Sequence, residues 1–155
     1  MMQEQNTQLN MVKLGIVANT CACFNLRKAS RTVTQLYDEI LQPSGLLATQ
    51  FTLLVAIALA GSVTITHLAE ELVMDRTTLT RNLKPLERQG LIEIEPGQDQ
   101  RTRVVTLTAS GREALALAIP LWEQAQASVV EGLGQNRWST LLSNLADTVL
   151  LTHKT

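Results

Sequence analysis

The segment from Asp75 to Thr108 constrains the fold of this chain more than any other segment. It opens with an aspartate, a favourable helix N-cap, and three leucines then follow at positions i, i+4 and i+7 of a helix. Gly90 ends the helical pattern, and the next five residues, Leu-Ile-Glu-Ile-Glu, alternate as in a strand. A Pro-Gly turn and a second strand, residues 103–107, complete a hairpin. The segment therefore predicts an amphipathic helix followed by a two-stranded ribbon.

The residues before this segment predict a second short helix. Thr64 is a good N-cap, apolar residues recur behind it, and Val73 and Met74 form the turn that leads to Asp75. Two short helices and a hairpin form a winged helix-turn-helix, in which one helix enters a DNA major groove and the wing lies beside it. We therefore expect a mainly α fold with a small β wing, in which additional helices form a dimer.

The flanking segments are expected to be helical. Residues 1 to about 12 are polar and should fray, and a first long helix should begin near Asn19 or Thr20, both good caps. Pro43 and Gly45 should end it. A buried helix should span residues 47–60, and a later helix should be capped by Thr108 or Ser110. Pro85 should bend or loosen its helix, whereas Pro120 either kinks a helix or separates two. A terminal amphipathic helix is expected from about residue 137 to residue 151.

Composition limits the classes of function. The 155 residues include 45% hydrophobic residues and have a net charge of −1, so the chain can bury a core but is no polycation. DNA binding would need a local basic patch. No signal peptide or membrane span is evident, which favours the cytoplasm. Two cysteines form no disulfide framework, and His67 and His153 lie too far apart to suggest a metal. We expect no cofactor.

A polar face on the helix after Asp75 provides the patch. Threonine hydroxyls and the guanidinium groups of arginine can contact bases and phosphates, and arginine at a hairpin tip suits a narrow minor groove. The residues expected to contact double-stranded DNA are Arg76, Thr77, Thr78, Thr80, Arg81, Lys84, Arg101 and Arg103. Asp99, between them, should orient an arginine or stabilise the turn.

Residues 64–111, with R-T-T-L-T-R, L-E-R-Q-G-L-I and D-x-R-x-x-x-V-x-L-T, resemble the MarR (multiple antibiotic resistance regulator) family. The resemblance implies a homodimeric winged-helix regulator, not an enzyme, that binds near-palindromic DNA and is released by a small ligand or by oxidation. It divides the chain into dimerisation helices, about 12–45 and 109–155, and a winged helix-turn-helix of about 46–108.

The first helix is similar to that of the organic hydroperoxide regulators. Cys23 and Tyr37 match the sensing cysteine and one of its tyrosine partners, while Arg27 and Ala48 stand where two other tyrosines occur. Tyr37 lies 14 residues after Cys23, about 21 Å along a helix, so only the tyrosine of a partner subunit could contact that cysteine. Release by a small aromatic or anionic ligand, with Arg27 binding its charge, is our first expectation. Redox sensing through Cys23, near a helix start that stabilises a thiolate, is the alternative.

Two other classes of function fit the sequence less well. An enzyme could use Cys23 as a nucleophile, but no histidine is placed in sequence as its base, and no phosphate-binding loop or carboxylate pair is present. A winged helix used only to bind proteins would not need a basic, hydroxyl-rich helix face. Both are therefore less favoured than a regulator of transcription.

Overall fold

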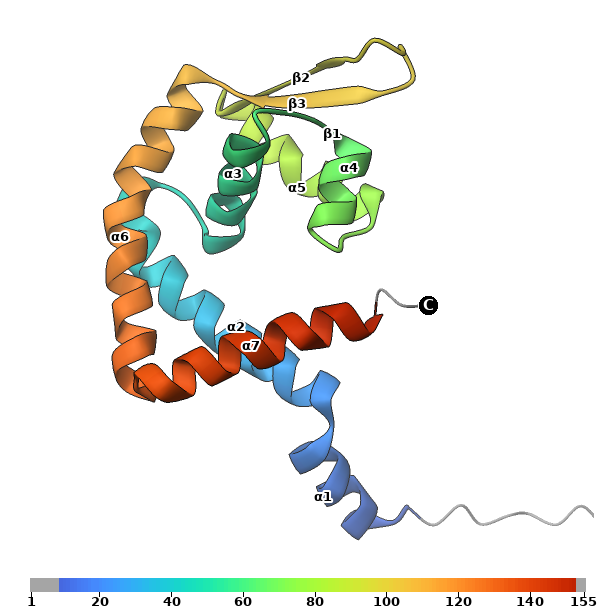
Figure 1. Cartoon of the computed structure of the whole chain (residues 1–155), viewed down its shortest axis with the longest axis vertical. Helices are drawn as coiled ribbons and strands as arrows, with labels where there is room; N and C mark the ends of the chain where they lie inside the picture. Colours follow the sequence, from blue (N-terminus) through green and yellow to red (C-terminus); the bar gives the residue numbers. More distant parts are fainter. Residues whose placement is uncertain (1–8, 153–155) are drawn as a thin grey trace, which may run out of the picture. The chain divides into compact units, whose positions relative to one another are not determined.

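The computed structural model describes residues 9–152, so His153 lies outside the described residues. The chain divides into two compact units, Met1–Leu36 and Tyr37–Thr155, and each is described by itself. The structure is mainly helical with one small sheet, as expected (Figure 1).

A three-stranded antiparallel sheet organises the second unit. Its strands are β1 (Ser62–Thr64), β2 (Ile92–Pro96) and β3 (Arg103–Leu107), in the order β1-β3-β2. Val105 is central, since it pairs with Val63 on one side and with Ile94 on the other. The hairpin β2–β3 was predicted. The strand β1 was missed, because three residues are too few to show an alternating pattern.

Three helices lie on the same side of this sheet (Figure 1): α3 (Ala48–Ala60), α4 (Ile65–Glu71) and α5 (Arg76–Arg88). The predicted caps are present, since the Thr64 hydroxyl accepts a hydrogen bond from the His67 N–H and the Asp75 carboxylate accepts one from the Thr78 N–H. The core between the helices and the sheet is aliphatic. Its fully buried members include Leu54, Ile57, Leu68, Leu79, Leu83, Leu86, Ile92 and Val105.

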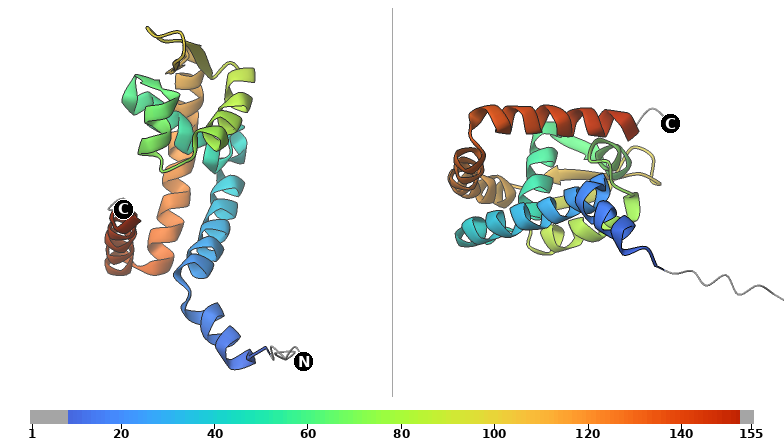
Figure 2. Two further views of the ribbon diagram at one scale, coloured as in Figure 1. Left: turned by 90° about the vertical axis from the view of Figure 1, so that its right-hand side faces the viewer. Right: turned by 90° about the horizontal axis from the view of Figure 1, so that it is seen from below.

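Two long helices follow the wing, α6 (Ala109–Leu133) and α7 (Gln135–Thr152). The two views in Figure 2 show α6 as one continuous helix between the sheet and α7. Thr108 caps α6, and Pro120 lies within it, so the alternative of two separate helices is wrong. Pro85 likewise lies within α5, which continues to Arg88.

The first unit holds α1 (Met11–Thr20) and most of α2, which spans Ala22–Leu41 and ends in the second unit. The long helix expected to start near Asn19 or Thr20 is α2, which begins at Ala22. The capping role expected of Asn19 and Thr20 was wrong, because these residues end an additional helix, α1, which Asn10 caps. Their side chains donate to the carbonyl oxygens of Gly15 and Ile16. The end of α2 was predicted correctly, since a 3-10 turn, η1 (Gln42–Ser44), follows Leu41.

Residues 9–152 include no single helix long and apolar enough to cross a membrane. Only α2 with η1 and α3, taken together across the bend between them, meet the length and composition of a span.

Gly111 fixes the start of α6 against the base of the wing. It is buried, and a Cβ added there would meet the backbone carbonyl oxygen of Leu91. Gly111→Ala should therefore destabilise the fold by about 1–3 kcal/mol in urea unfolding, because a backbone atom yields little to overpacking. Gly132→Ala is the control in the same helix, since its Cβ would meet nothing within 4 Å. Alanine there should stabilise the helix by up to about 1 kcal/mol. Equal effects at both glycines would contradict the close contact.

Candidate nucleic-acid interface

The helix α5 has one buried face and one charged face. Leu79, Leu83 and Leu86 are completely buried, which directs the opposite side of the helix to solvent. That side forms a hollow of about 400 Å³, lined only by Arg76, Thr77, Thr80, Arg81 and Lys84. Three cations and two hydroxyl groups thus surround one concave surface, which suits phosphate oxygens and base edges.

Thr80 and Thr78 occupy different surroundings. The Thr80 hydroxyl lines the hollow and donates to the Arg76 carbonyl oxygen at 2.8 Å. Thr78 is half-buried, and its N–H donates to the Asp75 carboxylate at 2.9 Å. Thr78 therefore belongs to the cap of α5, and the hollow assembles the other five residues expected on this helix.

The wing tip is ordered by Asp99. Its carboxylate accepts from the Arg101 N–H at 3.0 Å, and its carbonyl oxygen accepts from both the N–H and the hydroxyl of Thr102. Asp99 thus stabilises the turn, one of the two roles expected of it. The Arg103 guanidinium donates to the Gln100 carbonyl oxygen at 3.4 Å. Arg101 is exposed beside it, so the turn presents its guanidinium to solvent.

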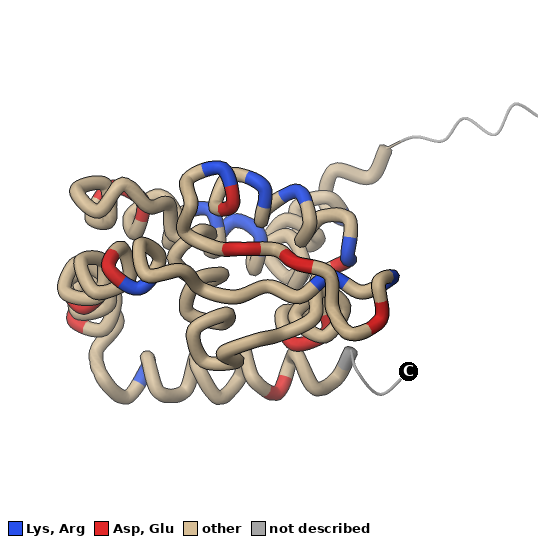
Figure 3. The backbone as a smooth tube through the Cα atoms, turned by 90° about the horizontal axis from the view of Figure 1, so that it is seen from above, with Lys and Arg blue, Asp and Glu red and all other residues tan. Residues whose placement is uncertain are grey.

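Acidic residues lie close to the basic residues of this unit in the sequence, but outside the lining of the α5 hollow. Figure 3 marks the basic and acidic positions along the backbone. The helix α5 carries Arg76, Arg81, Lys84 and Arg88, together with the acidic Glu87. The acidic Glu93 and Glu95 lie on β2, both exposed. The hollow on α5 has no acidic residue in its lining. A local basic surface therefore exists on a chain whose net charge is −1.

The three residues expected to sense an effector lie on one helix but not in one unit. Cys23 and Arg27 are exposed in the first unit, at the start of α2. Tyr37 belongs to the second unit, and its hydroxyl donates to the Gln126 side-chain oxygen at 2.6 Å. Partial burial raises the pKa of the Tyr37 phenol, which therefore stays neutral. Tyr37 links α2 to α6 within one chain, a contact that sequence spacing did not indicate.

One charged surface was missed in the sequence. Phe24, Arg27, Lys28 and Arg31 line a hollow of about 270 Å³ on α2, although only Arg27 was singled out from the sequence. The signal was available, since these residues stand at i, i+3, i+4 and i+7 of one helix.

Comparison with known proteins assigns the family. A model of the MarR family matches residues 44–102, which include the sheet strand β1, both short helices and the wing tip. The transcriptional regulator MosR of M. tuberculosis, solved in complex with DNA, is 41% identical, covers 85% of this chain and 98% of its own, and superposes with a TM-score of 0.75. The chain belongs to the MarR family.

Two other relatives agree with this assignment. A mutant of MarR from E. coli, solved with operator DNA, is 25% identical over 85% of this chain and 96% of its own, with a TM-score of 0.77. The organic hydroperoxide resistance transcriptional regulator of Bacillus subtilis is 32% identical over 90 residues, which is 57% of this chain. The match spans 61% of that regulator's length. MarR proteins are winged-helix regulators of transcription rather than enzymes, as the resemblance implied.

The cap of α5 predicts a response to acid. A side-chain hydrogen bond with Thr78, and then the bond from the Thr78 N–H, hold the pKa of Asp75 below its ordinary value of 3.8. A lowered folded-state pKa adds stability above that ordinary value, and the added stability is lost as the pH falls through the folded-state pKa. Asp75→Asn keeps a capping oxygen but cannot titrate. In urea unfolding between about pH 5 and about pH 3, the variant should lose less stability than the parent. Equal losses would show that Asp75 does not contribute.

Proposed function

We propose that this protein is a homodimeric regulator, acting as a repressor, that binds a near-palindromic operator and is released by a small ligand. Residues of about 12–45 and 109–155 dimerise, and residues of about 46–108 bind double-stranded DNA. In this proposal it acts in the cytoplasm, where the operator lies. The observation on which the proposal depends most is the hollow on α5, whose five lining residues are all basic or hydroxyl-bearing.

The charged face of α5 is the proposed major-groove surface. Arg81 lies in the middle of the helix and can form a bidentate pair with a guanine, while Arg76 and Lys84 can bind phosphates at either end. Thr77 and Thr80 contribute hydroxyl groups to this DNA-binding surface, and Thr78 contributes its hydroxyl group nearer the N-cap of α5. Arg101 and Arg103 of the wing contact the neighbouring minor groove. The DNA complexes of MosR and E. coli MarR support this role, because both proteins share the fold.

Arg81→Ala should weaken operator binding by about 1–3 kcal/mol and relax base preference, because it removes a base contact. Arg101→Ala should weaken binding more on sites with A·T-rich flanks. Gel shifts at one salt concentration measure both. Arg88→Ala is the control, since Arg88 is on the same helix but outside the hollow, and its effect should be much smaller. Unchanged binding by both Arg81→Ala and Arg101→Ala would refute the assignment.

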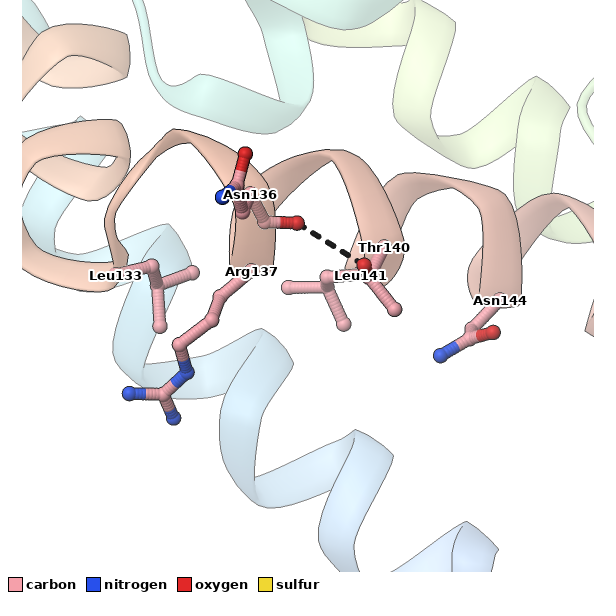
Figure 4. Close-up of a pocket in the computed structure, with 6 residues that line it drawn as sticks. All are labelled: Leu133, Asn136, Arg137, Thr140, Leu141 and Asn144. Atoms are coloured by element: carbon pink, nitrogen blue, oxygen red, sulfur yellow. Dashed lines mark hydrogen bonds between the residues drawn. The ribbon is translucent and has the colours of Figure 1, made fainter.

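Dimerisation is proposed from the terminal helix. None of the described residues of α7 is buried, although Leu141 and Leu145 recur on one side and are each 37% exposed. A hollow of about 400 Å³ lies at the end of α6 and along the start of α7. Figure 4 draws the residues that line it: Leu133, Asn136, Arg137, Thr140, Leu141 and Asn144. Most residues that line the hollow are polar, whereas Leu141, Leu142 and Leu145 of α7 are exposed apolar side chains, and a second copy of the chain would cover them best.

Leu141→Glu should produce a monomer in sedimentation at micromolar concentration, since it adds a charge to the apolar side of α7. Ser143→Glu adds the same charge to the same helix, two residues further along and about 200° around the axis, and should remain a dimer. A parent protein that sediments as a monomer would refute the proposed assembly.

Two mechanisms of release compete. In the first, an aromatic or anionic ligand binds near Arg27 and changes the spacing of the two α5 helices. In the second, the exposed Cys23 thiol is oxidised to a sulfenic acid and then forms a mixed disulfide with a small thiol, releasing water. Either must favour the released state by several kcal/mol to move most of the protein off DNA. We favour the ligand, because only one of three sensing tyrosines is present and its hydroxyl is bonded to Gln126.

Cys23→Ser separates the two mechanisms. If a ligand is the effector, hydroperoxide with a small thiol should leave operator binding unchanged in both the parent and the variant, while an aromatic acid should release both. Gel shifts and intact-protein mass measure binding and oxidation together. Release of the parent but not of Cys23→Ser by the oxidant would establish the redox mechanism instead.

A further inference from the structure

Every charged residue in the described part of the first unit is basic. From Leu9 to Leu36 the sequence includes Lys13, Arg27, Lys28 and Arg31 but no aspartate or glutamate. Three of these four cations lie within five residues of α2. Among residues 9–152, no carboxylate forms an ion pair with any of the three. Their mutual repulsion is therefore not offset within the described chain.

These cations share one face with an aromatic ring. Residues three and four apart are neighbours on a helix surface, so Phe24 adjoins both Arg27 and Lys28, and Arg31 adjoins both in turn. The four side chains line one hollow of about 270 Å³. Arg27 and Arg31 also border a second hollow, of about 410 Å³, together with Leu26 and Ser30. The two arginines thus lie between two concave surfaces.

Two guanidinium groups, one ammonium group and one aromatic ring on this face indicate the chemical class of ligand that would fit it. A single carboxylate can pair with one guanidinium, whereas a diphosphate can be held by both arginines in bidentate pairs and by Lys28 as a point charge. Phe24 is 52% exposed beside them, so its ring can stack on a flat aromatic group.

We propose that the Phe24–Arg31 face of α2 binds a ligand of the nucleoside-diphosphate class, in which the phosphates lie on Arg27, Lys28 and Arg31 and the base stacks on Phe24. The proposal deepens the proposed function, on which it rests, because it gives the chemical class of the releasing ligand. It assigns ligand roles to Phe24, Lys28 and Arg31 as well as to Arg27.

Titration calorimetry with the DNA-free protein tests the site, with ADP, pyrophosphate and benzoate as probes at about 0.15 M salt. ADP should bind about tenfold more tightly than pyrophosphate, because only ADP has a base to stack, and benzoate should bind more weakly than both. Arg27→Gln and Arg31→Gln should each weaken ADP binding about tenfold. Phe24→Ala should weaken only ADP binding, to the level of pyrophosphate.

Lys13→Gln is the matched control, because it removes one positive charge from the same unit but from α1. It should leave ADP binding unchanged. An equal loss in Lys13→Gln, or equal affinity for benzoate and ADP, would show general attraction of anions and overturn the proposal. So would a loss of operator binding in Arg27→Gln as large as that in Arg81→Ala, since the face would then contact DNA.

The failures of the two proposals are distinguishable. A parent protein that binds operator but not ADP overturns the ligand site and leaves DNA binding intact. A parent protein that binds ADP but no operator overturns the proposed DNA binding and leaves the ligand site intact. Release of operator by ADP from the parent, but not from Arg31→Gln, supports both.

Discussion

Burial of three leucines on α5 is the constraint on which the rest of this structure depends. Leu79, Leu83 and Leu86 are completely buried among the residues of α3, α4 and the sheet, and each fully buried leucine side chain contributes about 1.5–3 kcal/mol. A rotation of α5 about its axis would expose them. The direction of the opposite face, which presents the hollow between Arg76 and Lys84, is therefore fixed by the core.

The wing is held to the same core by the backbone. Thr108 donates its N–H to the Leu91 carbonyl oxygen and its hydroxyl to the Gly90 carbonyl oxygen, while that hydroxyl also accepts from the Gly111 N–H. One residue thus connects the end of α5, the start of β2 and the cap of α6.

Local chemistry explains which parts of the fold the sequence predicted. The caps Thr64, Asp75 and Thr108 act within three residues, and the leucine spacing of α5 is a local pattern, so both are visible in a single sequence. The strand β1 depends on pairing with residues of β3 that lie 40 to 44 positions later, and three residues show no pattern of their own. The sequence predicts fraying only for residues 1 to about 12 and no helix for residues 13–18, so α1 was missed, although Asn10 precedes a run that includes several apolar residues.

The candidate sites also divide into residues that local spacing predicted and residues whose contacts join distant parts of the sequence. Five of the six α5 residues expected at the interface line one hollow, because helical spacing determines which side chains are neighbours. The bond from Tyr37 to Gln126 joins residues 89 positions apart, and no local pattern encodes it. The basic face of α2 was recoverable from helical spacing and from the absence of acidic residues between Leu9 and Leu36. The structure adds that no carboxylate among residues 9–152 forms an ion pair with it.

Dimethyl sulfate footprinting of the operator tests the central claim most directly, because the reagent methylates guanine N7 in the major groove and adenine N3 in the minor groove and so reports which groove each element occupies. The account predicts two protected major-groove patches whose centres are about one helical turn apart, each flanked by minor-groove protection from the wing. In Arg101→Ala the flanking protection should weaken while the major-groove patches remain. A single protected half-site, or uniform protection that does not depend on sequence, would contradict it.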